Sequence, residues 1–279
     1  MSAGTGYLLE NRATEAGSRF DALSTLFDPW TFAHLDAVGT GPGWRCWEVG
    51  AGGPSVPRWM TERVGRAGRV TATDIDVSWL DHDDGYEVLF HDVEHELPPD
   101  AYNLVHARLV LTHLPGRDRA LRTMAASLRP GGWVVVEDFD VGLQPRAGLD
   151  APSPERCRAN RLRDGFVELL AQRGVDLHFG RSLPSRLRAL GLVDVRADAY
   201  LPLAMPATLE LELANLRQVH AALIAAGFHE TELEAHAEGL EVGLLDIATP
   251  PLVSAWGRRP TEQEGRSATN GGVESWLAS

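Results

Sequence analysis

The chain has 279 residues, of which 44% are hydrophobic and 23% charged, as in an ordinary globular protein rather than a disordered one. All 26 basic residues are arginine, so the chain has no lysine for a Schiff base or for a Walker A phosphate loop. The net charge of −13 disfavours a nucleic-acid partner, because the phosphate backbone would repel it.

The apolar runs and the cysteines indicate where the protein acts. No apolar run approaches the roughly 18 residues of a membrane-spanning helix, and the N-terminus lacks the basic start and apolar core of a secretory signal. Two cysteines cannot build a disulfide framework or a cysteine-based zinc site. We therefore expect a cytoplasmic protein with no membrane partner.

Hydrophobic periodicity and glycine or proline breaks divide the first half of the chain into helices and strands. The spacing predicts a helix within residues 6–37. Strands are expected at 44–49, 70–75, 86–91, 102–107 and 133–137, with helices at 55–64 and 117–128. Such alternation is typical of βαβ units and a parallel sheet.

Beyond residue 140 the pattern becomes more helical. We expect helices at 154–173, 183–190, 207–226 and 230–244, an extended segment at 192–203 and a last strand at 252–256. The amphipathic helix at 207–226 suits a roof over a pocket or the interface of a homodimer. The first of these helices carries four arginines whose offsets predict a solvated face: Arg156, Arg158, Arg161 and Arg163.

A glycine turn follows the first predicted strand, in residues 46–54 (CWEVGAGGP). Gly50 and Gly52 allow a ligand to approach the backbone closely. The dinucleotide fingerprint wants a further glycine where Ser55 stands. Glu48 precedes the turn, and its carboxylate would repel a pyrophosphate but attract a ligand that carries an ammonium and a sulfonium group. The turn therefore favours a cationic nucleoside over NAD.

Two acidic residues end the next two predicted strands. Asp74 can accept hydrogen bonds from both hydroxyls of a ribose, whereas Asp76 better suits the cap of a following helix. Asp92 can accept from the exocyclic amine of adenine, and the amide of Val93 can donate to a ring nitrogen. Histidine and glutamate side chains beside Asp92 also invite a metal-site hypothesis, which we set aside because no fourth ligand is evident.

In this order and spacing, the acidic strand with its glycine turn, Asp74 and Asp92 resemble the class I S-adenosylmethionine-dependent methyltransferases. Residues 102–108 (YNLVHAR), 111–115 (LTHLP) and 129–132 (RPGG) are similar to the later motifs of that family. The resemblance covers about residues 44–138. Two positions depart from the family pattern, since Pro54 stands where a third glycine is usual and Asn103 where an aspartate is usual.

The resemblance implies an α/β fold with a Rossmann-like, seven-stranded, mostly parallel sheet, helices on both faces and an antiparallel last strand. It implies an N-terminal helical lid at residues 1–40 and a methyltransferase domain at 41–258. Helical insertions around 141–180 and 205–245 would cap the substrate, and residues 259–279 would form a flexible tail. Tyr7 and Arg19 are candidate lid residues that reach the carboxylate of the cofactor.

The same resemblance implies the cofactor S-adenosyl-L-methionine, with S-adenosyl-L-homocysteine as product, and no metal. The residues that would hold the cofactor are Glu48, Gly50, Gly52, Asp74, Ile75, Asp92, Val93, Ala107 and Arg108. His113 is the candidate general base, because it follows the fourth strand near the position of the methyl group. A turn-capping role for His113 stays open. His106 lies within the strand and is expected to be structural, while Asp138 and Asp140 are candidates for orienting the substrate.

The expected reaction is methyl transfer to a small organic acceptor, with O- or N-methylation favoured and a place in specialised metabolism. In-line displacement from a sulfonium depends mainly on alignment, and a base is needed only where the accepting atom carries a proton. Two alternatives remain open from the sequence. One is an NAD-dependent oxidoreductase on a doubly wound sheet, and the other is a cofactor-binding module without catalysis.

Overall fold

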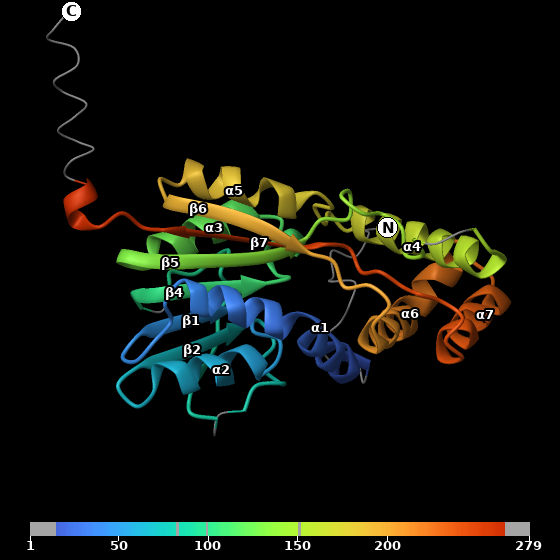
Figure 1. Ribbon diagram of the computed structural model, residues 1–279, viewed down its shortest axis with the longest axis horizontal. Helices are drawn as coiled ribbons and strands as arrows, with labels where there is room; N and C mark the ends of the chain where they lie inside the picture. The colour runs from blue at the N-terminus through green and yellow to red at the C-terminus, as the bar shows by residue number, and fades with distance from the viewer. Residues whose placement is uncertain (1–14, 82–83, 99, 150–151, 266–279) are drawn as a thin grey trace, which may run out of the picture.

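The computed structural model describes residues 15–265, apart from 82–83, 99 and 150–151. Its strands are β1 Arg45–Val49, β2 Arg69–Asp74, β3 Glu87–Phe90, β4 Tyr102–Arg108, β5 Leu128–Phe139, β6 Val193–Tyr200 and β7 Leu252–Arg258. They form a seven-stranded sheet in the order β3-β2-β1-β4-β5-β7-β6 (Figure 1). The first five strands pair in parallel, and β7 runs antiparallel to both β5 and β6. The predicted fold class is confirmed.

Helices cover both faces of this sheet. They are α1 Glu15–Ala37, α2 Ser55–Val64, α3 Arg117–Ala126, α4 Pro154–Gln172, α5 Phe179–Ala189, α6 Pro206–Ala225 and α7 Glu230–Glu241, with a 3₁₀ turn, η1, at Leu111–His113. Side chains of α1 and α2 share one core with one face of the strands. Side chains of α3 and α5 share a second core with the opposite face.

The alternation of side chains along β1 explains these two cores. Successive residues of a strand point to opposite faces of its sheet. Trp47 and Val49 therefore pack toward α3 and α5, whereas Cys46 packs toward α1 and α2. Glu48 points to the same face as Cys46, and this direction decides its role in the site below.

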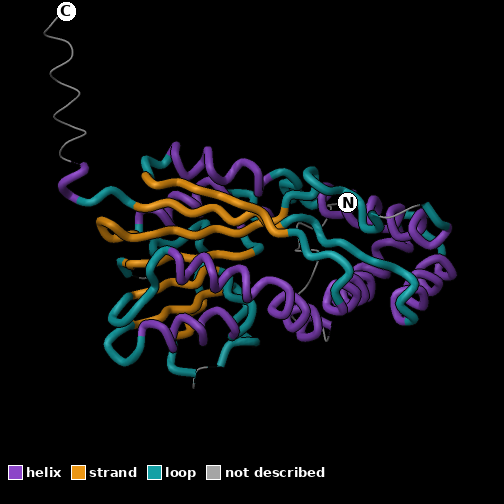
Figure 2. Tube along the Cα trace, in the orientation of Figure 1, coloured by secondary structure: helices purple, strands orange, loops and turns teal. Residues whose placement is uncertain are grey.

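Three helices gather beyond the carboxyl ends of the parallel strands, where Figure 2 shows helices and loops without sheet. Leucines of α4, α6 and α7 form a core of their own. The first half of α1 packs against α6 through Leu23, Phe27 and Leu211, so α1 bridges the sheet and this helical end. Leu211 and other buried residues of α6 therefore contribute to the core of the molecule, whereas Ile224 near the end of the helix is exposed.

Several boundaries differ by a few residues from the sequence prediction, and the start of β5 has a structural reason. β5 begins at Leu128, five residues before the predicted start, because Leu128 already pairs with Tyr102. The register shifts between that pair and the next, at Leu104, so the expected turn at 130–132 is an irregularity inside the strand. Gly131 allows the strand to bend here, because glycine adopts its φ of +82° easily.

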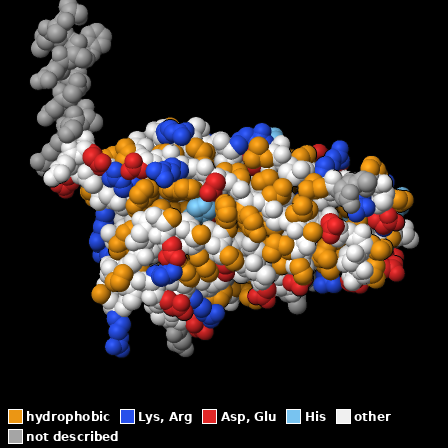
Figure 3. All heavy atoms as spheres, viewed as in Figure 1, with side chains coloured by type: hydrophobic (Ala, Val, Ile, Leu, Met, Phe, Trp, Pro, Cys, Tyr) orange, Lys and Arg blue, Asp and Glu red, His pale blue; other side chains and the backbone are white. Residues whose placement is uncertain are grey.

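Acidic and basic side chains are interspersed over the face of the molecule seen in Figure 3. Among the described helices, none combines the length and the apolar character needed to cross a membrane. Tyr7 of the expected lid, and the tail beyond residue 265, lie outside the described residues.

Candidate active site

A cleft of about 730 Å³ opens at the carboxyl edge of the sheet, within the size range of cofactor sites. The loops after β1, β2, β3 and β4 form its floor, and the first turns of α1 form one wall. The cleft brings together most of the residues that the sequence predicted for cofactor binding and catalysis. These are Gly50, Gly52, Asp74, Ile75, Asp92, Val93, Arg108 and His113.

The glycine turn fits closely against its neighbours. Gly50 has a φ of +63°, and a Cβ built there would lie 2.4 Å from Cγ2 of Val110. Gly52 has a φ of +61°, and its Cβ would approach the Phe20 ring to 2.9 Å. Both positions therefore need glycine for conformation and for space. Pro54 caps α2 at φ −83°, near the value that proline prefers, so its presence in place of a third glycine does not strain the turn.

Asp74 fastens this turn to the end of β2. Its carboxylate accepts one hydrogen bond of 2.9 Å from the Gly52 amide and another of 2.9 Å from the Asp76 amide. Burial raises the pKa of Asp74, and the backbone donors only partly offset that effect. A carboxylate has about four lone-pair sites, so Asp74 can still accept from a ribose hydroxyl beside its backbone donors.

The adenine side of the cleft combines an apolar surface with an acid. Ile75 lines the cleft and is 62% exposed, which leaves a flat apolar face for a ring. Asp92 accepts from the Glu94 amide at 2.9 Å and contacts Nδ1 of His95 at 2.7 Å. These contacts outweigh a small burial penalty and lower the pKa of Asp92. Among the residues that the structure describes, no cluster of three metal-ligating side chains is found.

Two of the predicted cofactor residues do not reach the cleft. Glu48 is 2% exposed, and its Oε2 lies 2.6 Å from Nδ1 of His106 on the α1 and α2 face. Ala107 is buried on the opposite face, among the residues of the α3 and α5 core. Glu48 and Ala107 are thus not brought together with the other predicted cofactor residues. Strand alternation explains it, because the backbone of the turn faces the ligand while these side chains point into the two cores.

Glu48 belongs instead to a buried polar network beneath the cleft. His106 lies between Glu48 and Glu137, with its Nε2 3.5 Å from Oε2 of Glu137. Burial would lower the pKa of His106, but the two carboxylates outweigh it and raise that pKa to about 9. Thr31 donates to Glu137 and accepts at 3.0 Å from Arg108. The structural role expected for His106 agrees with this position.

Arg108 connects that network to the cleft. Its Nη2 lies 2.8 Å from Oδ1 of Asp28 on α1, and its Nη1 donates to Thr31 on the same helix. The side chain also lines the cleft. Arg108 thus holds α1 across the ends of the parallel strands, which is where a lid over the cofactor has to lie.

A second, smaller pocket of about 90 Å³ adjoins the cleft under α4 and α6. Five residues line both spaces and mark where they meet: Arg19, Leu23, Leu109, His113 and Val175. Burial lowers the pKa of His113 to about 4, and the cations Arg19 and Arg117 add to the effect. The imidazole is therefore neutral at physiological pH, and so low a pKa makes it a weak base.

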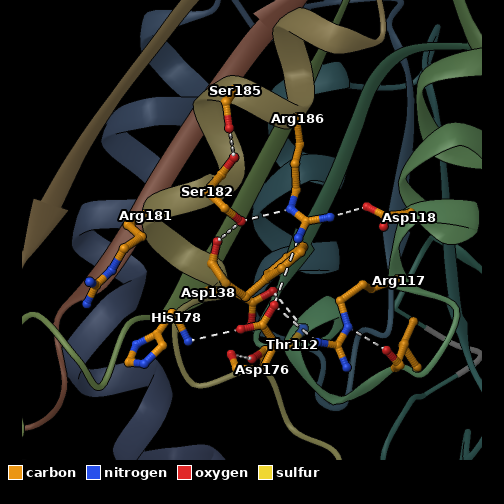
Figure 4. A network of polar contacts seen from close by, with 12 residues as sticks. Thr112, Arg117, Asp118, Asp138, Asp176, His178, Arg181, Ser182, Ser185 and Arg186 are labelled. Atoms are coloured by element: carbon orange, nitrogen blue, oxygen red, sulfur yellow. Dashed lines mark hydrogen bonds and ion pairs between the residues drawn. The ribbon is translucent and has the colours of Figure 1, made fainter.

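The turn that carries His113 is held by contacts on its far side. Thr112 donates through its hydroxyl to the carbonyl of Asp176 at 2.8 Å, and Asp176 returns a backbone hydrogen bond of 3.1 Å to the Thr112 carbonyl. Arg117 lies 3.2 Å from the Asp176 carboxylate (Figure 4). These contacts fix η1 against the loop that precedes α5. His113 and Val175 consequently face the junction from a rigid support.

Asp138 and Asp140 do not line either space. Asp138 is fully buried, accepts at 3.3 Å from the Thr112 amide, and has its pKa raised well above the usual range by burial. Asp140 accepts at 2.7 Å from the guanidinium of Arg181 at the start of α5. The expectation that these two acids orient a substrate is wrong for this conformation, because both are engaged in anchoring η1 and α5.

Sequence reasoning also missed a buried ion pair in the smaller pocket. Arg163, expected on a solvated face, is 4% exposed, and its Nη2 lies 3.0 Å from Oε2 of Glu212 on α6. Arg161 does lie on the exposed side of the helix. Arg163 falls on the apolar stripe that Val167 and Leu170 continue at i+4 and i+7. An arginine within an apolar stripe was the signal available in the sequence.

The comparisons with known sequences agree with this geometry. A family model described as a methyltransferase domain matches residues 10–197. "Methyltransferase str3" of Strobilurus tenacellus is 34% identical over 95 residues, which are 33% of this chain and 31% of that protein. The ubiquinone/menaquinone biosynthesis C-methyltransferase UbiE of Laribacter hongkongensis is 32% identical over 120 residues, 39% of this chain and 49% of that one. The chain thus spans a third to a half of the length of these relatives.

Solved structures share the fold at low identity. The chain superposes on phosphoethanolamine N-methyltransferase 2 of Haemonchus contortus, solved with S-adenosylhomocysteine, with a TM-score of 0.56 and 17% identity, covering 93% of this chain and 61% of that one. A putative sarcosine dimethylglycine methyltransferase of Galdieria sulphuraria gives a TM-score of 0.51 and 15% identity, covering 84% and 85%.

Proposed function

This chain belongs to the class I S-adenosylmethionine-dependent methyltransferases, and on that premise we propose that it methylates a small organic acceptor on oxygen or nitrogen. The observation that carries the proposal is the junction of two spaces at His113. One space has the acids and glycines suited to a nucleoside, and the other is a pocket under α4 and α6. An acceptor in the pocket would meet the methyl donor where the two spaces join.

The cleft residues fit the cofactor. Asp74 can still accept from a ribose hydroxyl, and Ile75 offers an apolar face beside Asp92 for the adenine. The positive φ of Gly50 and Gly52 keeps side-chain atoms out of the space beside the turn. When bound, S-adenosylmethionine supplies a methyl group on a positively charged sulfur, and that sulfur leaves as a neutral thioether.

The residues of the chain then have to align the acceptor with the methyl group. Leu23, Leu109 and Val175 surround the junction with apolar atoms and exclude water from it. Neutral His113 accepts a hydrogen bond from a hydroxyl or amine of the acceptor and orients it toward the methyl group. The proton of the methylated oxygen or nitrogen is released to solvent, because an imidazole with so low a pKa does not hold it.

Binding of the donor tests the proposal directly. Calorimetric titration of the full chain with S-adenosylmethionine, S-adenosylhomocysteine and NAD should give saturable binding of the first two and none of NAD. Binding of NAD alone would restore the oxidoreductase alternative. Mass spectrometry of candidate acceptors after incubation with the donor then separates turnover from binding without catalysis, because each transferred methyl group adds one CH₂ unit.

The proposal extends to the compartment and the metabolic role of the reaction. Both cysteines, buried Cys46 and exposed Cys157, are free, as in a reducing cytoplasm. The relatives from Strobilurus tenacellus and Laribacter hongkongensis match only 33% and 39% of this chain, so the acceptor is inferred from the pocket and not from them. We place the protein in specialised metabolism, with a small molecule rather than a nucleic acid as acceptor.

A further inference from the structure

The smaller pocket has both apolar and polar side chains in its wall. Phe139, Phe166 and Leu211 belong to its apolar lining. Arg163 and Asn215, from α4 and α6, line the part of the pocket that the cofactor cleft does not share. A ligand that passes from the junction into this pocket thus meets apolar side chains and then two hydrogen-bonding ones.

The Arg163 and Asn215 side chains have unused hydrogen-bonding atoms. Nη2 of Arg163 donates to Glu212 at 3.0 Å and to the Ala248 carbonyl at 3.2 Å, but its buried Nη1 has no partner. Oδ1 of Asn215 is likewise buried without a partner. An unsatisfied buried donor of a charged group is costly, so a ligand oxygen at Nη1 would relieve a cost that the protein alone leaves in place.

Glu212 already provides a buried negative charge beside Arg163. Burial would raise the pKa of Glu212, but Arg163 and His236 outweigh it and lower that pKa to about 2, so Glu212 is ionised. His236 is fully buried, with its Nε2 3.7 Å from Oε1 of Glu212. A carboxylate at Arg163 Nη1 would therefore bring a second buried anion close to Glu212. A neutral oxygen accepts the same hydrogen bond without that repulsion.

We propose that the acceptor is a neutral, mainly apolar hydroxy compound with a carbonyl-bearing arm, whose oxygen accepts a hydrogen bond from Arg163 Nη1 while its hydroxyl lies at His113. This inference rests on the proposed function. The pocket volume of about 90 Å³ is smaller than the roughly 150 Å³ of a cavity that binds benzene. Only a narrow arm enters it, and the rest of the acceptor occupies the junction and the adjoining cleft.

Three phenols of similar shape test this class, each titrated by calorimetry into the full chain saturated with S-adenosylhomocysteine. They are 4-hydroxyacetophenone with a ketone, 4-ethylphenol without that oxygen, and 4-hydroxybenzoate with a carboxylate. We expect the ketone to bind at least tenfold more tightly than either of the others. Tighter binding of the carboxylate, equal binding of all three, or binding of none overturns the proposal.

Variants of the pocket test whether Arg163 causes the preference for the ketone. Replacing Arg163 alone would leave Glu212 unpaired and threaten the fold, so the test variant is the double substitution Arg163→Met with Glu212→Met, which removes both charges. It should bind the ketone and the ethyl compound equally. The matched control is Arg161→Gln on the exposed side of the same helix, which should keep the tenfold preference. A preference retained in the double variant would contradict the proposal.

Binding of S-adenosylhomocysteine distinguishes a failure of the proposed function from a failure of the proposed acceptor class. The double variant should bind S-adenosylhomocysteine within about threefold of the parent chain, because neither residue lines the cofactor cleft. If the parent chain does not bind S-adenosylhomocysteine, the proposed function itself fails. If it binds the product but does not distinguish the phenols, only the acceptor class fails.

Discussion

Asp74 has two tasks, since it fastens the glycine turn and lines the cleft. Asp74→Asn should weaken S-adenosylmethionine binding at least tenfold, about 1.4 kcal/mol. The amide keeps the size of the side chain but replaces one acceptor oxygen by a donor, which cannot accept from both Gly52 and a ribose. Calorimetry measures the change. Asp36→Asn at an exposed ion pair is the control, and an unchanged affinity in Asp74→Asn contradicts the ribose assignment.

His113 offers a pH test that is independent of any acceptor. Its pKa of about 4 in the folded chain lies below the ordinary value of 6.5, so between these values the unfolded chain binds more protons. Stability should therefore fall as pH drops from 6.5 to 4, and His113→Asn should remove up to about 3 kcal/mol of that fall. Urea unfolding of both proteins at pH 7 and pH 5 measures it. Equal losses in the two proteins would contradict a buried, neutral imidazole.

At the scale of elements, the buried network joins β1, β4, β5 and α1, with His106 between Glu48 and Glu137 and His34 of α1 also beside Glu137. His106 has a pKa raised to about 9, so its charge stabilises the fold fully below pH 6.5, and that contribution is lost as pH rises through 9. His106→Gln should abolish this pH dependence, which amounts to as much as about 3 kcal/mol. Unfolding by urea at pH 6 and pH 9 measures the difference.

The control for His106 is His220→Gln, a partly exposed histidine that contacts Glu230 on the surface. This variant should retain the parent loss of stability between pH 6 and pH 9. A His106→Gln protein that loses as much stability over that range as the parent would contradict the raised pKa.

The ends of helices and strands were predictable where the local sequence pattern determines them. The strand at β2 ends at Asp74 as its pattern indicates, and α2 follows the glycine turn as expected. The direction of the Glu48 side chain was not predictable from the motif, because the glycines that follow it do not indicate which face of β1 this side chain takes. Arg163 was missed for a different reason, since its partner Glu212 lies 49 residues away on another helix. The apolar stripe around Arg163 could have predicted its burial, but neither segment alone indicates which residue pairs with it.

At the scale of the whole molecule, the sheet and the helical end share one junction. The net charge of −13 coexists with arginines around these spaces, since Arg108 lines the cleft, Arg19 the junction and Arg163 the pocket. Because α1 lines the cleft and packs against α6, a ligand at the strand ends contacts the segment that also supports the acceptor pocket. Donor and acceptor binding are therefore expected to be coupled through α1.

Hydrogen exchange with and without S-adenosylhomocysteine tests that coupling. Ligand binding stabilises the native state against local opening, so exchange should slow most in segments that line the cleft. Residues 19–24 of α1 and 109–115 around η1 should gain protection. The helix α7 lines neither space and should exchange at the same rate in both states, which makes it an internal control. Protection confined to 109–115, with residues 19–24 unchanged, would mean that α1 is no part of the lid.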